Sequence, residues 1–243
     1  EVLREAQELG YAERNPEADV EGYDTCRKIA ILTAMMTGKE VNYEDIHTEG
    51  ITKITDVDFR YAKELGTSVK LLGTSRIVGE KVYTKVAPVM IGKEHPLYAV
   101  SGVYNGILVK SDMLGTSMYY GSGAGKLPTA SAVVADLIEA AQNEKTNVPI
   151  GWGTEKQEIA DNKTSECCYF VRIAGTVKEK AELVQETLGE VRTLALENVD
   201  EFAVLTKKIC ETEFTKRAIA LDSECHKKGE DGIRQIIRAE LED

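Results

Sequence analysis

No stretch of the sequence is long and apolar enough to cross a bilayer, which takes ~20 consecutive, mostly apolar residues. Residues 1–5 mix charged and apolar side chains and lack the hydrophobic segment of a secretory signal peptide. The sequence also contains no repeat and no low-complexity tract. We therefore expect a folded, globular protein with no membrane partner.

Basic residues are scarce relative to acidic ones. The 30 Lys and Arg residues are outnumbered by 41 Asp and Glu residues, so the formal net charge is -11 at pH 7. Binding to a nucleic-acid backbone depends on clustered positive charge that displaces counterions. The composition therefore argues against a nucleic-acid partner, whereas 42% hydrophobic residues are enough to form a sizeable core.

The cysteines are few, and their spacing is not typical of a metal site. There are 5, an odd number, and Cys167 and Cys168 are adjacent. In a strand these two side chains would point to opposite faces, which is a poor geometry for one disulfide. We expect reduced thiols, a cytoplasmic protein and no bound metal.

The first half of the chain combines helical and strand-like patterns. A helix is expected over residues 2–9, ended by Gly10, and a second over 20–36, with Asp19 as its N-cap and Gly38 after its last turn. The other expected elements are a helix over 56–65 ended by Gly66, strands over 69–72, 82–86 and 107–110 joined as hairpins, and a helix that begins at Pro128.

Two of these helices have apolar stripes that predict buried faces. The candidate core positions are Ile29, Ala30, Leu32 and Met36 in the earlier helix, and Val133, Val134, Leu137, Ile138 and Ala141 in the later one.

A polar stretch over residues 143–165 indicates a domain boundary. After it, the pattern predicts a strand over 168–173 and a helix over 177–188. The remaining expected elements are strands over 191–196, 202–209 and 218–221 and a final helix over 232–241. The order β-α-β-β-(β or α)-α suggests a small sandwich with helices on one face.

Asp24 and Lys28 are the first candidates for chemistry. They are four residues apart on an expected helix, so they share one face. Two interpretations are open. The pair is either a surface ion pair worth a few tenths of a kcal/mol, or part of a functional site.

The glycine-rich segment over residues 121–125 is the second candidate. Its glycines would let a ligand approach the backbone closely, next to a helix N-terminus that favours an anion. The segment fits neither the dinucleotide fingerprint nor the phosphate-binding loop, so a tight strand-to-helix turn is the alternative. His95, which precedes Pro96, is either a general acid or base or a hydrogen-bonded loop residue.

Several short segments follow one another in a characteristic order. They are Gly10-Tyr11-Ala12-Glu13, Asn15-Pro16, Asp19-Val20-Glu21-Gly22-Tyr23-Asp24-Thr25-Cys26-Arg27-Lys28, Glu49-Gly50-Ile51, Ala62-Lys63-Glu64-Leu65-Gly66, Lys70-Leu71-Leu72-Gly73, His95-Pro96-Leu97, Tyr120-Gly121-Ser122-Gly123-Ala124-Gly125 and Pro128-Thr129-Ala130-Ser131-Ala132-Val133-Val134-Ala135-Asp136. In this order they closely resemble the homoserine dehydrogenase family, over about residues 1–142.

The resemblance implies a fold and an activity. The fold would be α+β, with a mixed or antiparallel sheet covered by helices over residues 1–145, a linker over 146–165 and an ACT-like βαββαβ regulatory domain over 166–243. The activity would be the NAD- or NADP-dependent interconversion of L-aspartate-4-semialdehyde and L-homoserine, in a homodimer. A Rossmann domain normally precedes such a segment, so we expect this chain to be a fragment that is inactive alone. L-threonine is the possible effector of the ACT-like domain.

The resemblance also implies roles for individual residues. Lys28 would donate the proton during reduction, and Asp24 would orient Lys28 and bind the substrate hydroxyl. Glu13 would bind the substrate's ammonium group, and Asp19 would either do the same or only cap its helix. The cofactor would be approached by Gly10, Gly121 and Gly123.

Two other functions compete with this interpretation. The chain could be a non-catalytic module that dimerises and senses an amino acid. It could also belong to another oxidoreductase of the same fold, whose site accepts a different carbonyl compound. Consumption of NADPH with the semialdehyde, by this chain and by a longer protein, distinguishes the possibilities.

Overall fold

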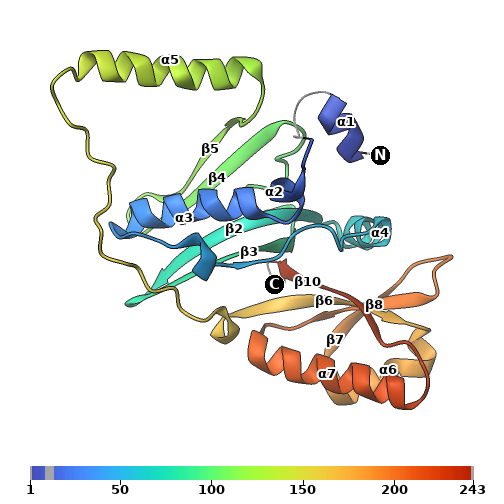
Figure 1. Cartoon of the computed structure of the whole chain (residues 1–243). Helices are drawn as coiled ribbons and strands as arrows, with labels where there is room; N and C mark the ends of the chain where they lie inside the picture. Colours follow the sequence, from blue (N-terminus) through green and yellow to red (C-terminus); the bar gives the residue numbers. More distant parts are fainter. Residues whose placement is uncertain (1, 9–13, 242–243) are drawn as a thin grey trace.

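One mixed β-sheet joins the two halves of the chain in the computed structural model, which describes residues 2–8 and 14–241 (Figure 1). Within these residues the sheet has eight strands, in the order β1-β3-β10-β6-β8-β7, with β2 paired to β3 and β9 to β6. The strands are β1 (His47–Thr48), β2 (Ser68–Val78), β3 (Lys81–Ile91), β6 (Glu166–Ala174), β7 (Val191–Ala195), β8 (Glu201–Thr206), β9 (Ile209–Cys210) and β10 (Ile233–Glu240). A separate antiparallel hairpin is formed by β4 (Tyr104–Ser111) and β5 (Gly115–Ser122).

The last strand, β10, lies in the middle of this sheet. It runs parallel to β3, where Arg238 is opposite Val89, and antiparallel to β6, where Arg238 is opposite Tyr169. The predicted segments 1–145 and 166–243 therefore share one sheet, and their division into domains remains a prediction. The mixed sheet confirms the α+β fold class in its coarse form.

The helices begin and end near glycines and capping residues. As predicted, α4 covers Asp56–Leu65, and α3 and α4 are followed by Gly38 and Gly66 with φ of 72° and 68°. Thr55 and Asp58 form a capping box at the start of α4. The other α-helices are α1 (Val2–Glu8), α2 (Glu17–Val20), α3 (Tyr23–Thr37), α5 (Lys126–Gln142), α6 (Val177–Leu188) and α7 (Glu211–Lys227).

Four predictions about helix starts, strands and helices are wrong. Asp19 is not an N-cap, because it lies inside α2 and the chain turns at Gly22, with φ of 79°, before α3 begins. Pro128 is the third residue of α5 rather than the first. Residues 218–221 belong to α7, and residues 232–241 contain strand β10 instead of a helix.

The order of the C-terminal elements nevertheless follows the implied βαββαβ pattern. It runs β6, α6, β7, β8, α7 and β10, with the two-residue strand β9 before α7. Helices α6 and α7 cover one face of the sheet, at the bottom of Figure 1. Helix α4 packs on the other face, where Tyr61 contacts Phe170 with ring centroids 5.5 Å apart.

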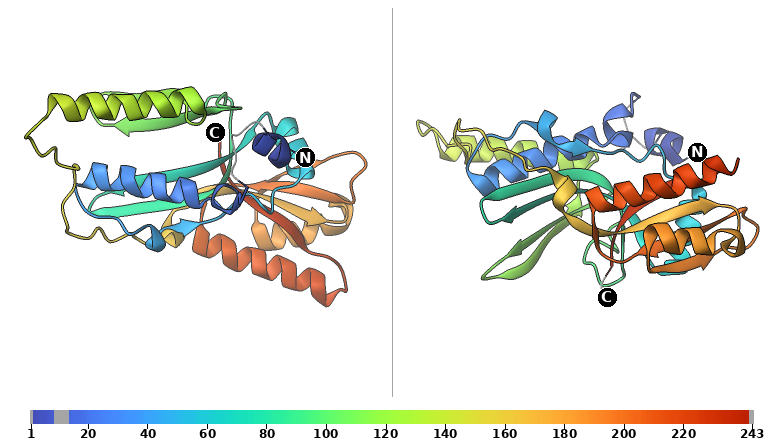
Figure 2. Two further views of the ribbon diagram at one scale, coloured as in Figure 1. Left: turned by 45° about the horizontal axis from the view of Figure 1, so that its top comes forward. Right: turned by 90° about the horizontal axis from the view of Figure 1, so that it is seen from below.

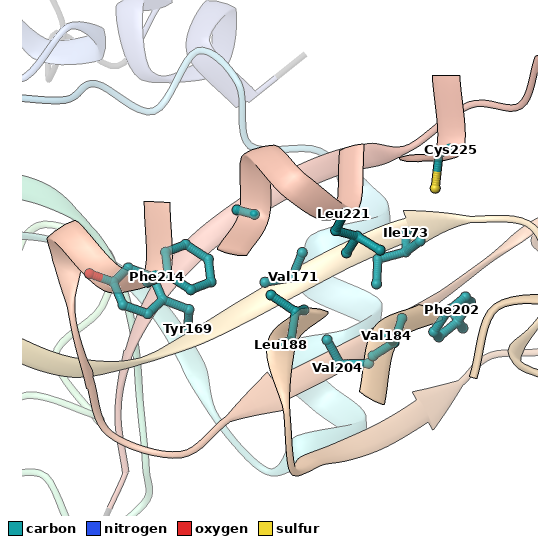
Figure 3. Close-up of a cluster of buried hydrophobic side chains, with 11 residues drawn as sticks. Tyr169, Val171, Ile173, Val184, Leu188, Phe202, Val204, Phe214, Leu221 and Cys225 are labelled. Carbon is teal, nitrogen blue, oxygen red and sulfur yellow. The ribbon is translucent and has the colours of Figure 1, made fainter. Parts of the chain in front are cut away.

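Strand β6 is buried on both faces, which explains its nearly continuous apolar sequence. On the α6–α7 side, Tyr169 stacks on Phe214 with ring centroids 3.7 Å apart (Figure 3). Cys167 contacts this cluster, whereas Cys168 belongs to the cluster under α4, so the two thiols face opposite sides as predicted. All 5 cysteines lie in the described residues as reduced thiols.

Helix α5 and the β4–β5 hairpin lie apart from the main sheet (Figures 1 and 2). The predicted helix forms, but its apolar stripe is not buried: Leu137 is 65% exposed and Val133 is 54% exposed. Met36, another predicted core residue, is 48% exposed on α3. The reason is that no other element in the described part of the chain covers these faces. None of the helices described there is long and apolar enough to span a membrane.

Candidate functional site

Helix α3 presents one face to the sheet and the other outward. Its buried residues, Cys26, Ala30, Thr33 and Ala34, recur at helical spacing toward the β2–β3 hairpin. Gly73 on β2 permits this contact, because a Cβ there would lie 3.0 Å from side-chain atoms of Thr25 and Ile29. The outward face carries Asp24 and Lys28.

Asp24 and Lys28 form an ion pair near the start of α3. The Nζ of Lys28 lies 2.6 Å from Oδ2 of Asp24, and the two side chains are 63% and 44% exposed, respectively. An exposed pair of this kind stabilises a protein by less than about 1 kcal/mol. The pair therefore adds little to folding and keeps its ammonium group open to a ligand, so both predicted interpretations agree with this geometry.

The other predicted substrate residues differ in what the structure shows. Asp19 is exposed on α2, and the N-cap of α3 is Gly22, which has no side chain to form a capping hydrogen bond. The capping alternative for Asp19 is therefore wrong, and its role in substrate binding remains a prediction. Glu13 and Gly10 lie outside the described residues.

The glycine-rich segment links β5 to α5. Gly121 lies opposite Asn105 in the β4–β5 hairpin, and a Cβ added at Gly121 would meet no atom of residues 2–8 and 14–241 within 4 Å. A Cβ at Gly123 would instead lie 2.2 Å from Nδ2 of Asn105. Gly125 has φ of 116° and precedes the first residue of α5. Gly121 thus leaves open space beside the backbone at this bend.

His95 makes a local loop contact, and neither of two surface hollows is lined by the Asp24–Lys28 pair. Nδ1 of His95 accepts a hydrogen bond from the backbone N–H of Leu97 at 3.2 Å, as expected of a loop histidine. A hollow beside Gly66 and another beside Tyr43 include neither Asp24 nor Lys28 in their walls. In the described residues, no three His, Cys, Asp or Glu side chains lie close enough to hold a metal ion.

Two ion clusters between the halves of the chain were not predicted from the sequence. In the first, buried Arg172 on β6 donates hydrogen bonds to Asp58 of α4 and Glu201 of β8, at 2.7–2.9 Å. A signal was present, because Arg172 is a lone charge within the apolar run of β6. In the second, Arg238 on β10 binds Glu49, which follows β1.

Charge and hydrogen bonding shift the titration of the second cluster. Burial acts to raise the pKa of Glu49, but the hydrogen bond with His47 and the charge of Arg238 outweigh it and lower the pKa to about 2. The same hydrogen bond, 2.7 Å from Nε2 of His47 to Oε1 of Glu49, raises the pKa of His47. Glu49 is therefore held as a carboxylate.

The stability contributed by Glu49 should disappear in acid. An unfolded glutamate has a pKa of ~4.3, so the folded protein with its lower value resists protonation. The difference in unfolding free energy between the parent and Glu49→Gln should have its full value above pH ~5. It should shrink as the pH falls toward 2. Urea titrations across this range measure it, with exposed Glu186→Gln as the control. A difference that stays constant down to pH 3 would contradict the prediction.

Much of the chain, including α3 and the glycine-rich segment, matches proteins of known family. The family model described as homoserine dehydrogenase matches residues 1–138. A curated homoserine dehydrogenase of Neisseria gonorrhoeae is 36% identical over 245 residues, which cover 97% of this chain and 55% of that protein. One from Synechocystis sp. is 51% identical over 142 residues, or 57% of this chain and 33% of that protein.

Solved structures agree with the sequence comparisons. The crystal structure of a homoserine dehydrogenase from Thiobacillus denitrificans is matched over 100% of this chain and 58% of its own chain, with a TM-score of 0.81 and 32% identity. Homoserine dehydrogenase from S. aureus at pH 7.5 is matched over 98% of this chain with a TM-score of 0.73 and 29% identity. The chain spans about half the length of the first of these curated relatives.

Proposed function

The chain belongs to the homoserine dehydrogenase family, and we propose that it supplies the substrate-binding and proton-transfer part of an enzyme that interconverts L-homoserine and L-aspartate-4-semialdehyde. The observation that carries the proposal is the exposed Asp24–Lys28 pair at the start of α3. This pair lies within the segment that the family model matches. The non-catalytic module is the less favoured alternative, because the matched relatives are dehydrogenases.

The residues of this chain fit the reduction of an aldehyde. Negative charge develops on the carbonyl oxygen as the carbon is reduced, and a positioned cation that also donates a proton stabilises that charge. Lys28 takes this role, and the carboxylate of Asp24 holds its ammonium group in one orientation and accepts a hydrogen bond from the substrate hydroxyl. Glu13 and Asp19 bind the substrate's ammonium group as carboxylates.

The proposed cofactor is NADP or NAD, whose nicotinamide ring supplies or accepts the hydride when bound. The residues present fit such a group, because Gly121 leaves open space beside the backbone and Gly125 adopts a positive φ just before α5. In the proposal Gly10, Gly121 and Gly123 approach the cofactor. The remaining contacts come from the part of the protein that lies outside this chain, since the chain spans about half of its relatives.

Replacing Gly121 with alanine should affect the cofactor and leave the fold intact. No atom of the described residues lies within 4 Å of the added Cβ, so the Tm of this chain should not change. In the full-length protein the KM for the nicotinamide cofactor should rise about tenfold, which corresponds to ~1.4 kcal/mol. Gly153→Ala, whose Cβ would come no closer than 3.9 Å to another atom, is the control. An unchanged cofactor KM would remove Gly121 from the cofactor site.

The C-terminal elements support a finer proposal. We infer that residues 166–243 form an ACT-like unit that binds L-threonine, on the basis of their βαββαβ order and the turn at Gly175, which has φ of 88° between β6 and α6. Calorimetry with L-threonine that shows neither heat nor a shift in melting would contradict this.

The apolar tip of the β4–β5 hairpin, where Met113 is 93% exposed, supports a homodimer. The free thiols suit a cytoplasmic protein.

One assay tests the proposed activity. NADPH consumption with L-aspartate-4-semialdehyde is measured for this chain and for the full-length protein that contains it. We expect turnover by the full-length protein alone, because this chain lacks half of its relatives' length. Absence of turnover in both would refute the proposal and favour the non-catalytic module.

A further inference from the structure

We propose that Arg238, on the last strand of the chain, is a positioning residue that holds the turn before α3 through Glu49. The inference rests on the proposed function, because α3 carries the pair assigned to catalysis. The link joins the C-terminal elements to the substrate site within one chain. It therefore connects β10 and α7 to the turn that positions the Asp24–Lys28 pair.

Arg238 joins three parts of the fold. Its Nη1 donates to both Oε1 and Oε2 of Glu49 at 2.8 Å, and its Nη2 donates to Oε1 of Glu211 at 3.0 Å. Glu211 is the first residue of α7, and Arg238 itself lies on β10. The side chain of Arg238 is 11% exposed, so water competes weakly for these bonds. The guanidinium fixes Glu49 relative to α7 and β10.

The residues after Glu49 hold the turn that leads into α3. The backbone N–H of Glu49 donates to the carbonyl of Val86 at 2.8 Å, and that of Ile51 donates to the carbonyl of Val20 at 2.7 Å. Between them, Gly50 lies so close to this turn that an added Cβ would be 2.3 Å from the oxygen of Val20. Residues 49–51 and 20–22 are therefore in direct backbone contact.

The position of the turn formed by residues 20–22 determines where α3 begins. Gly22 adopts φ of 79°, and a Cβ there would be 3.5 Å from the carbonyl oxygen of Glu49. Its own carbonyl accepts the first helical hydrogen bond, from the N–H of Cys26 at 2.9 Å. Asp24 is in that first turn, and Lys28 follows one turn later. A shift of Glu49 therefore moves the catalytic pair, and a misplacement of ~1 Å can lower a rate by ~100-fold.

Kinetics of the full-length protein test the positioning role. Arg238→Gln should lower kcat for L-homoserine by about tenfold or more and leave the KM for the nicotinamide cofactor within about twofold. Arg238→Lys should recover only part of the loss, because one ammonium nitrogen replaces the two guanidinium nitrogens that bind Glu49 and Glu211 separately. Arg234→Gln is the matched control: it is on the same strand and pairs with Glu201 at 3.2 Å, away from Glu49. Its kcat should stay within about twofold of the parent.

A double-mutant cycle identifies the path. If Arg238 acts through Glu49, then Arg238→Gln and Glu49→Gln each lower kcat, and the double variant loses no more than the worse single variant. Additive losses would overturn the proposal. An equal loss of kcat in Arg234→Gln would also overturn it, because loosening of the shared sheet would then be sufficient.

Hydrogen exchange of the full-length protein without ligands provides a readout independent of turnover. The Ile51 amide, which bonds to Val20, should exchange about tenfold faster in Arg238→Gln and at the parental rate in Arg234→Gln. Unchanged exchange at Ile51 would overturn the link. Faster exchange with an unchanged kcat would overturn the positioning role. If the parent did not turn over L-homoserine, the proposed function would fail, and faster exchange would still support the link from Arg238 to the turn.

Discussion

Lys28→Ala in the full-length protein should lower kcat by ~10²–10⁴-fold, the range expected when a general acid is removed. The melting temperature should hardly change, because the ion pair with Asp24 is exposed and Lys28 contributes little to packing. Steady-state rates in both directions and a thermal melt measure the two effects. A nearly normal kcat would leave the pair as a surface ion pair and remove Lys28 from the mechanism.

A conservative variant separates charge from proton transfer. Lys28→Arg keeps the positive charge near Asp24 but holds its proton too firmly to donate it, so it should recover little activity. Full recovery would show that charge alone is sufficient. Lys39→Ala is the matched control, because Lys39 also forms an ion pair, with Glu155 at 2.5 Å, but lies beyond the C-terminal end of α3. Its kcat should remain unchanged.

Arg172→Met should destabilise the protein by about 3–5 kcal/mol, because buried Asp58 loses the charge of Arg172 and buried Glu201 keeps only its ion pair with Arg234. The side chain of Asp58 is 0% exposed and that of Glu201 is 3% exposed, so water cannot replace the guanidinium. In a chain of this size such a loss lowers Tm by about 6–20 °C. Urea and thermal unfolding of this chain measure the change.

Two further variants keep this prediction testable. Arg172→Lys preserves a positive charge and should lose less stability, which remains measurable even if Arg172→Met does not fold. Lys207→Ala breaks an exposed pair with Glu190, whose side chains are 72% and 75% exposed, and should change stability by less than about 1 kcal/mol. A comparable loss in Arg172→Met and Lys207→Ala would show that burial does not control the effect.

Elements with local signals were predicted well from the sequence. Helix α4 has a capping box at Thr55 and ends at Gly66, so both of its boundaries are encoded by adjacent residues. The strands expected over 69–72, 82–86 and 107–110 lie inside β2, β3 and β4, and β2–β3 forms a hairpin between sequence neighbours, whereas β5 was not predicted. In these cases the chain needs no distant partner to select its structure.

Strand β10 was mistaken for a helix for a physical reason. Ile233, Ile236 and Ile237 recur at intervals of three and four, which is the spacing of one helical face. The structure instead has an irregularity in the pairing between Ile233 and Gln235, which shifts the register of the strand. The strand forms because β3 and β6 flank it, and neither partner is close to it in the sequence.

The candidate site could be predicted only in part. The spacing of Asp24 and Lys28 predicted their shared face, and the ion pair is present. The connection from Glu49 to Arg238 spans 189 positions and could not be inferred from spacing, because neither residue stands out locally. The apolar stripe of α5 predicted burial, but a stripe does not indicate whether its cover comes from the same chain.

The central place of β10 has a consequence for synthesis of the protein on the ribosome. Strand β3 is complete by Ile91, but the edge that receives residues 238–240 remains unpaired until about 150 further residues have been translated. An unpaired edge next to an apolar core is a site where strands of other chains can add. A chain that stops directly after Gln235 would keep that edge of β3 open permanently, so it should aggregate instead of folding.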